Sequence, residues 1–371
     1  MEEMNELTAE ERARILQHEL EAVYGSSSYK IGRAVTWLPR HAKKALAYLA
    51  HNGPAISAKY LYTYAKYHKI ANKEYAYWAC LQKKDYPEAL KKWFLEMNYT
   101  HQPLDLEHPK TFSEKTQWLK LYGHLDEQRD LVDKYKVRDW IREKVGEEYL
   151  IPLLGVWDRF DEIDFDKLPD RFVLKTNHGA GWNYIVQDKS KLDKADAKAK
   201  FDLWTKLNFT YYQGGLELQY EHIQPKIIAE QFIENDGGDL YDYKLCCFDG
   251  EPKVIIYIMN RYVDADERII CFDTDWNVLP FNLFTPLELP DAIPRPKNRE
   301  KMVEVARTLS QGIPFVRVDL YALTDGTIKF GEMTFTTYSG IAPWHPESAN
   351  DFMGSLIHLP GVDDAPAEGN A

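Results

Sequence analysis

The spacing of apolar and polar positions along the chain changes near residue 125. Before that point the pattern favours helices. It predicts them over residues 5–24, 29–50, 55–72, 85–97 and 111–122. The last helix starts after Thr111, with Glu114 three residues later. This is the spacing of a capping box, in which each side chain bonds the backbone N–H of the other residue.

After residue 125, short apolar segments bounded by turn residues predominate. They predict strands over 171–176, 183–187, 226–233, 241–248, 252–260, 268–272, 315–320 and 327–334. Further helices are predicted over 128–144, 189–207 and 298–311. Strands that are joined by hairpins and mixed with helices indicate an α+β or mixed α/β enzyme domain.

One predicted hairpin places two carboxylates opposite each other. Asp325-Gly326 is typical of a two-residue type I′ turn between two strands. With this turn, Asp319 lies directly opposite Glu332, and Arg317 lies opposite Thr334 on the same face of the sheet. The alternating residues between them, which are apolar, then point into the core.

Two like charges directly opposite on a sheet destabilise it. A divalent cation between Asp319 and Glu332 removes the repulsion. Mg²⁺ suits such a site, because it takes oxygen ligands from one or two carboxylates and from nucleotide phosphates. Two alternatives remain: Arg317 neutralises the pair, or the register of the hairpin differs.

A short glycine-bearing loop follows the apolar strand that ends near Lys175. Gly179 and Gly181 would let backbone N–H groups approach a phosphate closely, and Lys175 can pair with its charge. Taken alone, the segment is better explained as an ordinary hairpin, and His178 as a loop histidine. It therefore needs support from other segments before a role in catalysis is assigned.

Three further segments carry residues that could contact a nucleotide. Lys134 is expected in the first half of the 128–144 helix, where lysines are usually solvated. A base could lie against the apolar strand that contains Glu230. Asp242 and Lys244 share one face of the next strand, which ends in an Asp-Gly turn. The Asp242 carboxylate could take ribose hydroxyls, although an exposed strand face is the alternative.

In this order, the segments resemble the TupA-like ATP-grasp family, which is linked to cell-surface polymer synthesis. The resemblance runs from about His108 to Ser339, roughly two-thirds of the chain. The matching text is HPKTFSEKTQWLKLY, DKYKVRDWI, FVLKTNHGAGWN, AEQFIENDGGDLYDYKLCCFDGEP, FVRVDLY and FGEMTFTTYSG. Each motif alone is weak, and together they are specific.

The resemblance implies an α+β fold of the ATP-grasp type, in which two α+β lobes sandwich ATP. A helical, basic extension would occupy residues 1–80 and a helical region residues 81–130. The small lobe with the phosphate loop would span 131–229, and the large lobe with the metal site 230–350. A flexible tail would follow at 351–371.

The resemblance also implies roles for individual residues. The expected ATP contacts are Lys134, Lys175, His178, Gly179, Gly181, Glu230, Gln231, Phe232, Ile233 and Asp242. The expected Mg²⁺ ligands are Asp319, Glu332 and Thr334, and the expected catalytic contacts are Arg317, Lys244 and His178. Thr334 departs from the pattern of ATP-grasp enzymes, which commonly have Asn two residues after the metal-binding Glu, and a hydroxyl is a weaker metal ligand.

The activity that the resemblance implies is ATP-dependent, ADP-forming ligation of a carboxylate to an amine through an acyl phosphate. The carboxylate would be a uronic acid, free or in a lipid-linked glycan. An amino acid or amine would be attached to it during synthesis of a bacterial capsule or other surface polysaccharide. Two alternatives are a glycosyltransferase, although Asp273-Thr274-Asp275 is no clear DxD motif, and a weakly active ATP-binding module.

Charge is distributed unevenly along the chain. Residues 22–73 contain nine Lys or Arg and no Asp or Glu, which gives this stretch a charge of +9. Since the whole chain has a net charge of −12, the remainder of the chain has a charge of −21 (−12 minus +9). Basic residues interleaved with tyrosines suit an anionic membrane surface. A solvated helical extension packed on the main domain is the first interpretation, membrane contact comes second, and RNA is well behind.

The composition indicates where the protein is located, but it points to no further catalytic or metal site. The four cysteines show no CxxC spacing and no metal-type pairing with histidine, which indicates reduced thiols. The acidic, polar N-terminus does not resemble a secretory signal, and no apolar run is long enough for a membrane span. We therefore expect a cytoplasmic protein, with peripheral contact to the inner face of the plasma membrane as an open question. Nucleic acid is disfavoured by the acidic balance.

Overall fold

The structure is a computed structural model that describes residues 74–212, 214–234, 240–259, 267–290, 293, 295–359 and 361–363. The helices expected over 5–24, 29–50 and 55–72 lie outside these residues, as does the basic stretch 22–73. Among the described residues, no helix has both the length and the apolar character to cross a membrane.

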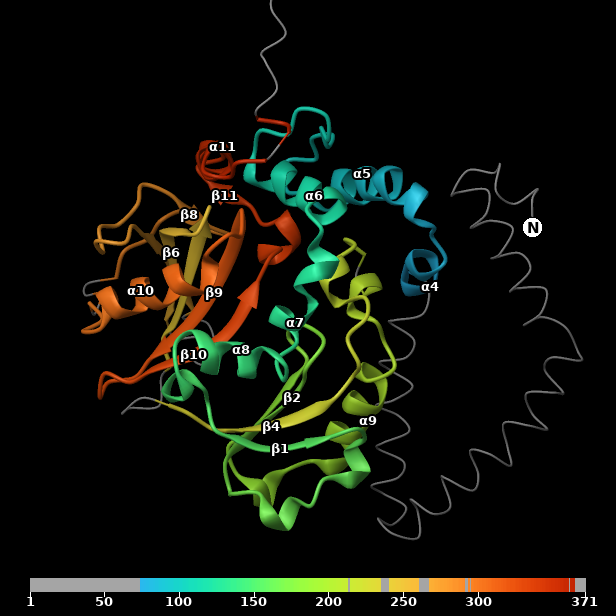
Figure 1. Cartoon of the computed structure of the whole chain (residues 1–371), viewed down its shortest axis with the longest axis vertical. Helices are drawn as coiled ribbons and strands as arrows, with labels where there is room; N and C mark the ends of the chain where they lie inside the picture. The colour runs from blue at the N-terminus through green and yellow to red at the C-terminus, as the bar shows by residue number, and fades with distance from the viewer. Residues whose placement is uncertain are drawn as a thin grey trace, which may run out of the picture.

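Three helices open the described chain: α4 (Glu74–Ala79), α5 (Tyr86–Met97) and α6 (Phe112–Tyr122). The predicted capping box starts α6: Glu114 N donates to Thr111 Oγ1 at 3.1 Å, and Thr111 N donates to the Glu114 carboxylate at 2.9 Å. Apolar residues of α4 and α5, among them Trp78, Leu90 and Trp93, form a small core together with Leu104, Leu106 and Leu216. These helices lie along one side of the molecule (Figure 1).

The helix predicted over 128–144 is wrong as a single element. It is divided into α7 (Arg129–Val132) and α8 (Val137–Lys144). At the break, Asp133 takes an extended conformation, and its Oδ1 accepts from the backbone N–H groups of Tyr135 and Lys136 at 2.9 and 3.2 Å. A short acidic side chain that bonds nearby N–H groups competes with the helical pattern. Lys134 therefore lies in a turn rather than on a helix.

The smaller sheet has four antiparallel strands. They are β1 (Leu153–Trp157), β2 (Phe172–Thr176), β3 (Asn183–Val186) and β4 (Ile227–Gln231), in the order β1-β4-β2-β3. Alternate residues of β2 and β4 pack on α9 (Lys194–Trp204), where Phe172, Ala229 and Phe201 are fully buried. The opposite face, with Lys175 and Glu230, is left for other contacts.

The larger sheet has five antiparallel strands. They are β5 (Asp242–Phe248), β6 (Glu251–Met259), β7 (Arg268–Phe272), β9 (Phe315–Ala322) and β10 (Ile328–Thr334), in the order β10-β9-β5-β6-β7. The Asp249-Gly250 turn joins β5 to β6 with φ values of 48° and 83°, as a type I′ turn requires.

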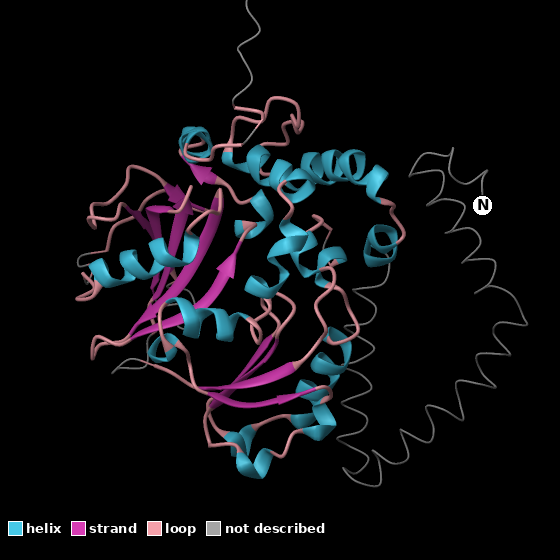
Figure 2. Cartoon of the chain, in the orientation of Figure 1, coloured by secondary structure: helices cyan, strands magenta, loops and turns pink. Residues whose placement is uncertain are grey.

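Helices cover the two faces of the larger sheet. Met302 and Ala306 of α10 (Arg299–Ser310) pack against Val318 on one face. α6 and α11 (Ser348–Ser355) pack on the other, together with the short pair β8 (Asn282–Leu283) and β11 (Trp344–His345). The two sheets are separate layers, and α8 lies between them in Figures 1 and 2.

Two of the expected boundaries differ from the structure. The boundary at 229/230 falls inside β4, so Glu230 belongs to the four-stranded sheet of the small lobe. The tail expected from 351 starts inside α11, and the chain stays packed beyond that helix. Leu359 is fully buried, and Asp363 accepts from Lys115 Nζ at 2.8 Å. Residues 364–371 lie outside the described chain.

Candidate active site

The β9–β10 hairpin brings Asp319 and Glu332 opposite each other, as predicted, but with a different turn. Leu323 N donates to Thr327 O at 2.8 Å, which leaves a loop of three residues with Gly326 at φ 92°. The register near this loop is one residue off the predicted one, and a bulge at Gly331 restores it. Without the bulge, Glu332 would face the other side of the sheet.

Asp319 is held by two cations, one on its own strand β9 and one on the neighbouring strand β5. Arg317 donates from Nε to Oδ1 at 2.6 Å and from Nη2 to Oδ2 at 2.8 Å. Lys244 Nζ lies 2.5 Å from Asp319 Oδ2 and 2.8 Å from Asp242 Oδ2. All four side chains are buried. The alternative in which Arg317 neutralises the carboxylate pair is therefore realised for Asp319.

Glu332 is held more loosely and is the more accessible carboxylate. Its side chain is 30% exposed, and its oxygens lie 3.3 Å from Lys134 Nζ and 3.6 Å from Arg317 Nη2. Burial alone would raise the pKa of Glu332, but the charges of Lys134, Arg317 and Lys244 outweigh it and lower the pKa to about 2. Glu332 is therefore an anion at every physiological pH. Thr334 Oγ1 accepts from Arg317 Nη2 at 3.1 Å.

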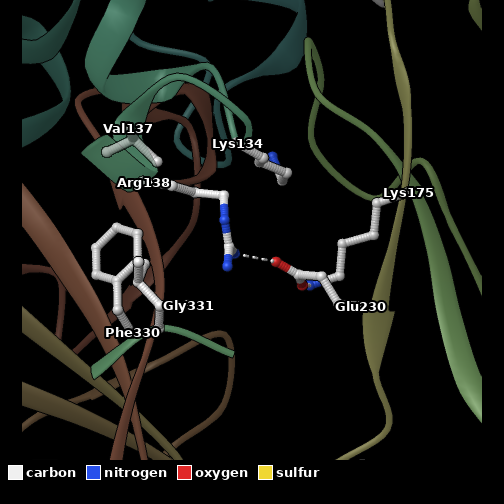
Figure 3. A pocket seen from close by; sticks show the side chains of 8 residues that line it. Lys134, Val137, Arg138, Lys175, Glu230, Phe330 and Gly331 are labelled. Carbon is white, nitrogen blue, oxygen red and sulfur yellow. Dashed lines mark hydrogen bonds and ion pairs between the residues drawn. The ribbon is translucent and has the colours of Figure 1, made fainter. Parts of the chain in front are cut away.

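A second charged group lies on the inner face of the smaller sheet. Lys175 Nζ donates to Glu230 Oε2 at 2.6 Å, and Arg138 Nη1 donates to Glu230 Oε1 at 3.1 Å. Figure 3 shows Arg138 and Lys175 reaching Glu230 from opposite sides. The pocket around them is lined by Lys134, Val137, Arg138, Leu150, Lys175, Glu230, Phe330 and Gly331. It therefore joins α8 to both sheets.

The glycine loop between β2 and β3 is anchored to the α7–α8 break. Lys134 Nζ donates to Gly179 O at 2.6 Å. Asn177 Nδ2 donates to Asp133 Oδ1 at 2.9 Å, and Lys134 N donates to Asn177 O at 3.0 Å. A Cβ on Gly179 would come within 2.7 Å of the Trp182 ring, so only glycine fits there. Gly181 has φ 71° with open space around it.

His178 points away from the charged groups. Its side chain is 1% exposed, and Nε2 lies 3.1 Å from Trp204 O and 3.2 Å from Leu207 O. Burial lowers its pKa to about 4, so the ring is neutral and donates from Nε2. This placement makes His178 a positioning residue for the loop and gives it no contact with the other candidate catalytic residues.

Three of the four residues expected to border the nucleotide base line two different pockets. Glu230 faces Lys175 and Arg138, whereas Gln231 and Phe232 line a second pocket. The Arg171 guanidinium lies over the Phe232 ring, 4.1 Å from its centroid. Ile233 is half-buried and lies two residues beyond the end of β4, near the undescribed residues 235–239.

Taken together, the candidate site collects charges from both sheets and from the α7–α8 region. Its cations are Lys134, Arg138, Lys175, Lys244 and Arg317, and its carboxylates are Glu230, Asp242, Asp319 and Glu332. Five cations and four carboxylates leave a charge of +1. Arg138 was missed from the sequence. Its position in DKYKVRDWI, four residues after Lys134, could have indicated that both side chains belong to the same site.

Comparison with solved structures gives distant matches. An L-amino acid ligase from Bacillus licheniformis is 17% identical, with 61% of this chain and 49% of that chain covered and a TM-score of 0.38. A D-alanine–D-alanine ligase from Bacillus anthracis, complexed with ATP, is 18% identical, with 55% of each chain covered and a TM-score of 0.31. The chain thus spans about half the length of these proteins.

No curated protein matches the chain. A family does: the one described as TupA-like ATPgrasp matches residues 114–358, well over half of the sequence. The matched range contains both sheets and every charged residue of the candidate site. The antiparallel sheets with helices on their faces agree with the α+β fold expected of this family. The chain belongs to the TupA-like ATP-grasp family.

Proposed function

We propose that the protein is an ATP-dependent carboxylate–amine ligase that forms ADP and acts through an acyl phosphate. The carboxylate is that of a uronic acid, and the acceptor is an amino acid or an amine, in the synthesis of a bacterial surface polysaccharide. The observation that carries this proposal is the collection of five cations and four carboxylates between the two sheets.

The ion pairs in this collection suit a site that binds charged ligands of both signs. Polyphosphate is an anion that needs cations on several sides, and Mg²⁺ needs carboxylate oxygens. Without these ligands, the lysines and carboxylates neutralise one another. With them bound, Lys134 would turn from Glu332 to a phosphate, and Glu332 would turn to the metal. The loose 3.3 Å contact between Lys134 and Glu332 is compatible with such an exchange.

The donor set fits Mg²⁺ bound together with a nucleotide. Asp319 and Glu332 are paired across adjacent strands and offer only oxygen ligands. Among the described residues, no group of three or more His, Cys, Asp or Glu could hold a metal ion. Phosphate oxygens would therefore complete the coordination, as is usual for Mg²⁺ at nucleotide sites. When bound, the ion would neutralise charge that develops on the transferred phosphoryl group.

The chain's own residues account for the remaining requirements of phosphoryl transfer. Lys134, Lys175 and Arg138 place positive charge from different sides of one pocket, which stabilises a transition state with charge spread over several oxygens. The Gly179–Gly181 loop can close over the phosphates and exclude water, which protects an acyl phosphate from hydrolysis. Arg317, which donates to Asp319 and Thr334, would stabilise the acyl phosphate.

We further propose that the protein works in the cytoplasm, at the inner face of the plasma membrane, on a free or lipid-linked glycan carboxylate. The basic stretch 22–73 supports this placement through its charge alone. Vesicle flotation of the full chain and of a variant without residues 1–80 tests it. Equal recovery of both proteins on vesicles that contain anionic lipid would contradict it.

The enzymatic test is ADP release with Mg²⁺ and ATP, screened against uronic acids paired with amino acids and amines. Glu332→Gln is measured beside wild type, and Glu304→Gln serves as a control, since Glu304 is an exposed carboxylate on α10. We expect turnover that requires both substrates and that only Glu332→Gln abolishes. Binding of Mg·ATP without acceptor-dependent ADP release would instead support an ATP-binding module. Failure to bind ATP would overturn the proposal.

A further inference from the structure

A second polar cluster lies beyond the end of β10, in the segment Thr336–Gly340. Lys120 of α6, which is 1% exposed, contacts this segment. Its Nζ donates to Ser339 O, to Ser339 Oγ and to Gln117 Oε1, each at 2.9 Å. Burial lowers the pKa of Lys120 to about 7, and its three contacts hold the amine against Ser339 and Gln117.

The segment is held in a conformation that side chains rarely adopt. Tyr338 and Ser339 have φ values of 47° and 54°, in the left-handed region. A Cβ on Gly340 would come within 2.5 Å of Gln117 Nε2, and one on Gly215 within 2.9 Å of Ser339 Oγ. The segment is therefore packed closely between α6 and the chain near Gly215. Strained backbone that its surroundings hold in place is typical of functional sites.

Hydrogen-bond acceptors meet at the edge of this segment. Thr336 Oγ1 donates to Glu217 Oε2 at 2.8 Å, and Gln219 Nε2 donates to Thr336 Oγ1 at 2.9 Å. Glu217 is partly exposed, whereas Gln219 is 1% exposed. Gln219 Oε1 and Thr337 Oγ1 are buried without a hydrogen-bond partner among the residues that the structure describes. Gln219 Nε2 also lies 3.4 Å from Glu217 Oε2, so the amide nitrogen faces the carboxylate and the buried amide oxygen is left as an acceptor without a donor in the described part of the chain. A carboxylate and an unpartnered amide oxygen suit a ligand that donates N–H groups.

This cluster borders the carboxylate pair of the candidate site. The Arg317 guanidinium lies over the Tyr338 ring, 5.6 Å from its centroid, and the same guanidinium bonds Asp319. Buried Tyr220 has a pKa raised first by burial and then by the nearby charges of Glu217 and Glu332. Glu217 and Glu332 are thus both near enough to Tyr220 for their charges to act on it.

We propose that Glu217, with Gln219 and the Thr336–Gly340 segment, forms the subsite for the acceptor amine, and that Glu217 is the proton acceptor of the ligation step. This inference rests on the proposed ligase function and adds the acceptor's chemistry, a primary ammonium. Arg317 faces the acyl phosphate from one side, and Glu217 receives the cationic acceptor from the other.

The step balances as follows. Glu217 takes one proton from the incoming ammonium, which frees the lone pair of the nitrogen. The nitrogen attacks the acyl carbon and forms the C–N bond. The bond between the acyl carbon and the phosphate oxygen breaks, and inorganic phosphate leaves with the bonding electrons. The second proton of the nitrogen leaves with the phosphate, and Glu217 returns its proton to solvent.

Hydroxylamine separates this step from the formation of the acyl phosphate. It is largely uncharged at neutral pH, attacks acyl phosphates without a base, and gives a hydroxamate that is measured by its iron complex. The assay uses the full chain, Mg·ATP, and glucuronate or galacturonate, with either hydroxylamine or an amino-acid panel as acceptor. Glu217→Gln keeps the side-chain shape and the bond from Thr336 but removes the base.

We expect Glu217→Gln to lower kcat/KM for the amino-acid acceptor about 100-fold and to leave the hydroxamate rate within about threefold of wild type. Glu221→Gln is the matched control, because its carboxylate accepts from Tyr211 Oη at 2.7 Å instead. An equal loss of both reactions in Glu217→Gln, or no loss of either, would overturn the assignment of Glu217. If the wild-type protein formed neither product, the proposed ligase function, on which this inference rests, would be overturned.

Discussion

Lys134 Nζ lies 3.3 Å from Glu332 Oε2, so a cation from the α7–α8 break meets a carboxylate of the five-stranded sheet. The same Nζ donates to Gly179 O in the glycine loop of the smaller sheet, at 2.6 Å. One side chain thus touches the loop and the carboxylate pair, which belong to different sheets. A ligand that draws Lys134 to itself would change both contacts at once.

Replacement of Lys134 tests whether this cation serves ATP. In Lys134→Met we expect kcat/KM for ATP to fall about 10- to 100-fold, because a charge-assisted contact to phosphate is lost. Steady-state ADP release at varied ATP measures it. Lys136→Met is the matched control, since Lys136 is exposed and pairs with Asp130 on the surface. Similar losses in both variants would mean that Lys134 has no special contact with the nucleotide.

Arg138 is expected to stabilise the apo protein as well as to bind phosphate. It is buried beside Glu230, and removal of one partner of a buried ion pair leaves the other charge poorly compensated. We expect Arg138→Met to lower the free energy of unfolding by about 3 kcal/mol, as measured by urea denaturation. Arg142→Met, at an exposed position on the same helix, should change it little. Unchanged stability in Arg138→Met would contradict the buried pair.

His178 makes stability depend on pH. Its pKa falls from 6.5 to about 4 on folding because the ring is buried, so the folded state binds fewer protons between these values. Stability is therefore fully present above pH 6.5 and is lost as the pH falls toward 4. The loss is at most about 3 kcal/mol. His178→Gln, which keeps an N–H donor for the two carbonyls, should flatten this dependence in thermal unfolding curves.

The control for that experiment is His222→Gln, because the His222 side chain is 64% exposed. This variant should keep the acid sensitivity of wild type. A His178→Gln protein with an unchanged pH profile between 4 and 6.5 would show that His178 is not the buried neutral group.

Thr334 offers a test of the metal site. An amide oxygen is a better ligand for Mg²⁺ than the hydroxyl of Thr334. We expect Thr334→Asn to lower the Mg²⁺ concentration that gives half-maximal ADP release. Thr334→Val, which removes the acceptor for Arg317, should not lower it. A higher Mg²⁺ requirement in Thr334→Asn would place the metal away from this residue.

The β9–β10 hairpin shows how far sequence reasoning reached. The pairing of Asp319 with Glu332 was predicted correctly, although the two-residue Asp-Gly turn from which it was inferred is not the turn that forms. The turn itself was wrong by one residue, and the bulge at Gly331 corrected the register. A glycine inside a strand is a known signal for a bulge, so the second departure was visible in the sequence.

Contacts between distant segments were harder to foresee. At the helix break, the Asp133 carboxylate also accepts from Asn177, which is far away in sequence. The direction of His178 depends on carbonyls at the end of α9. The contact between Lys120 and Ser339 joins residues that share no local pattern. Only tertiary packing sets such contacts, and a single sequence does not display it.

Transfer of ¹⁸O tests the proposed chemistry most directly. A uronic acid labelled with ¹⁸O in its carboxylate is converted with Mg·ATP and the acceptor found in the ADP-release screen. The inorganic phosphate is then analysed by mass spectrometry. A ligase that acts through an acyl phosphate must move one ¹⁸O from the carboxylate to the phosphate in each turnover. Release of ADP together with unlabelled phosphate would contradict an acyl phosphate and, with it, the proposed function.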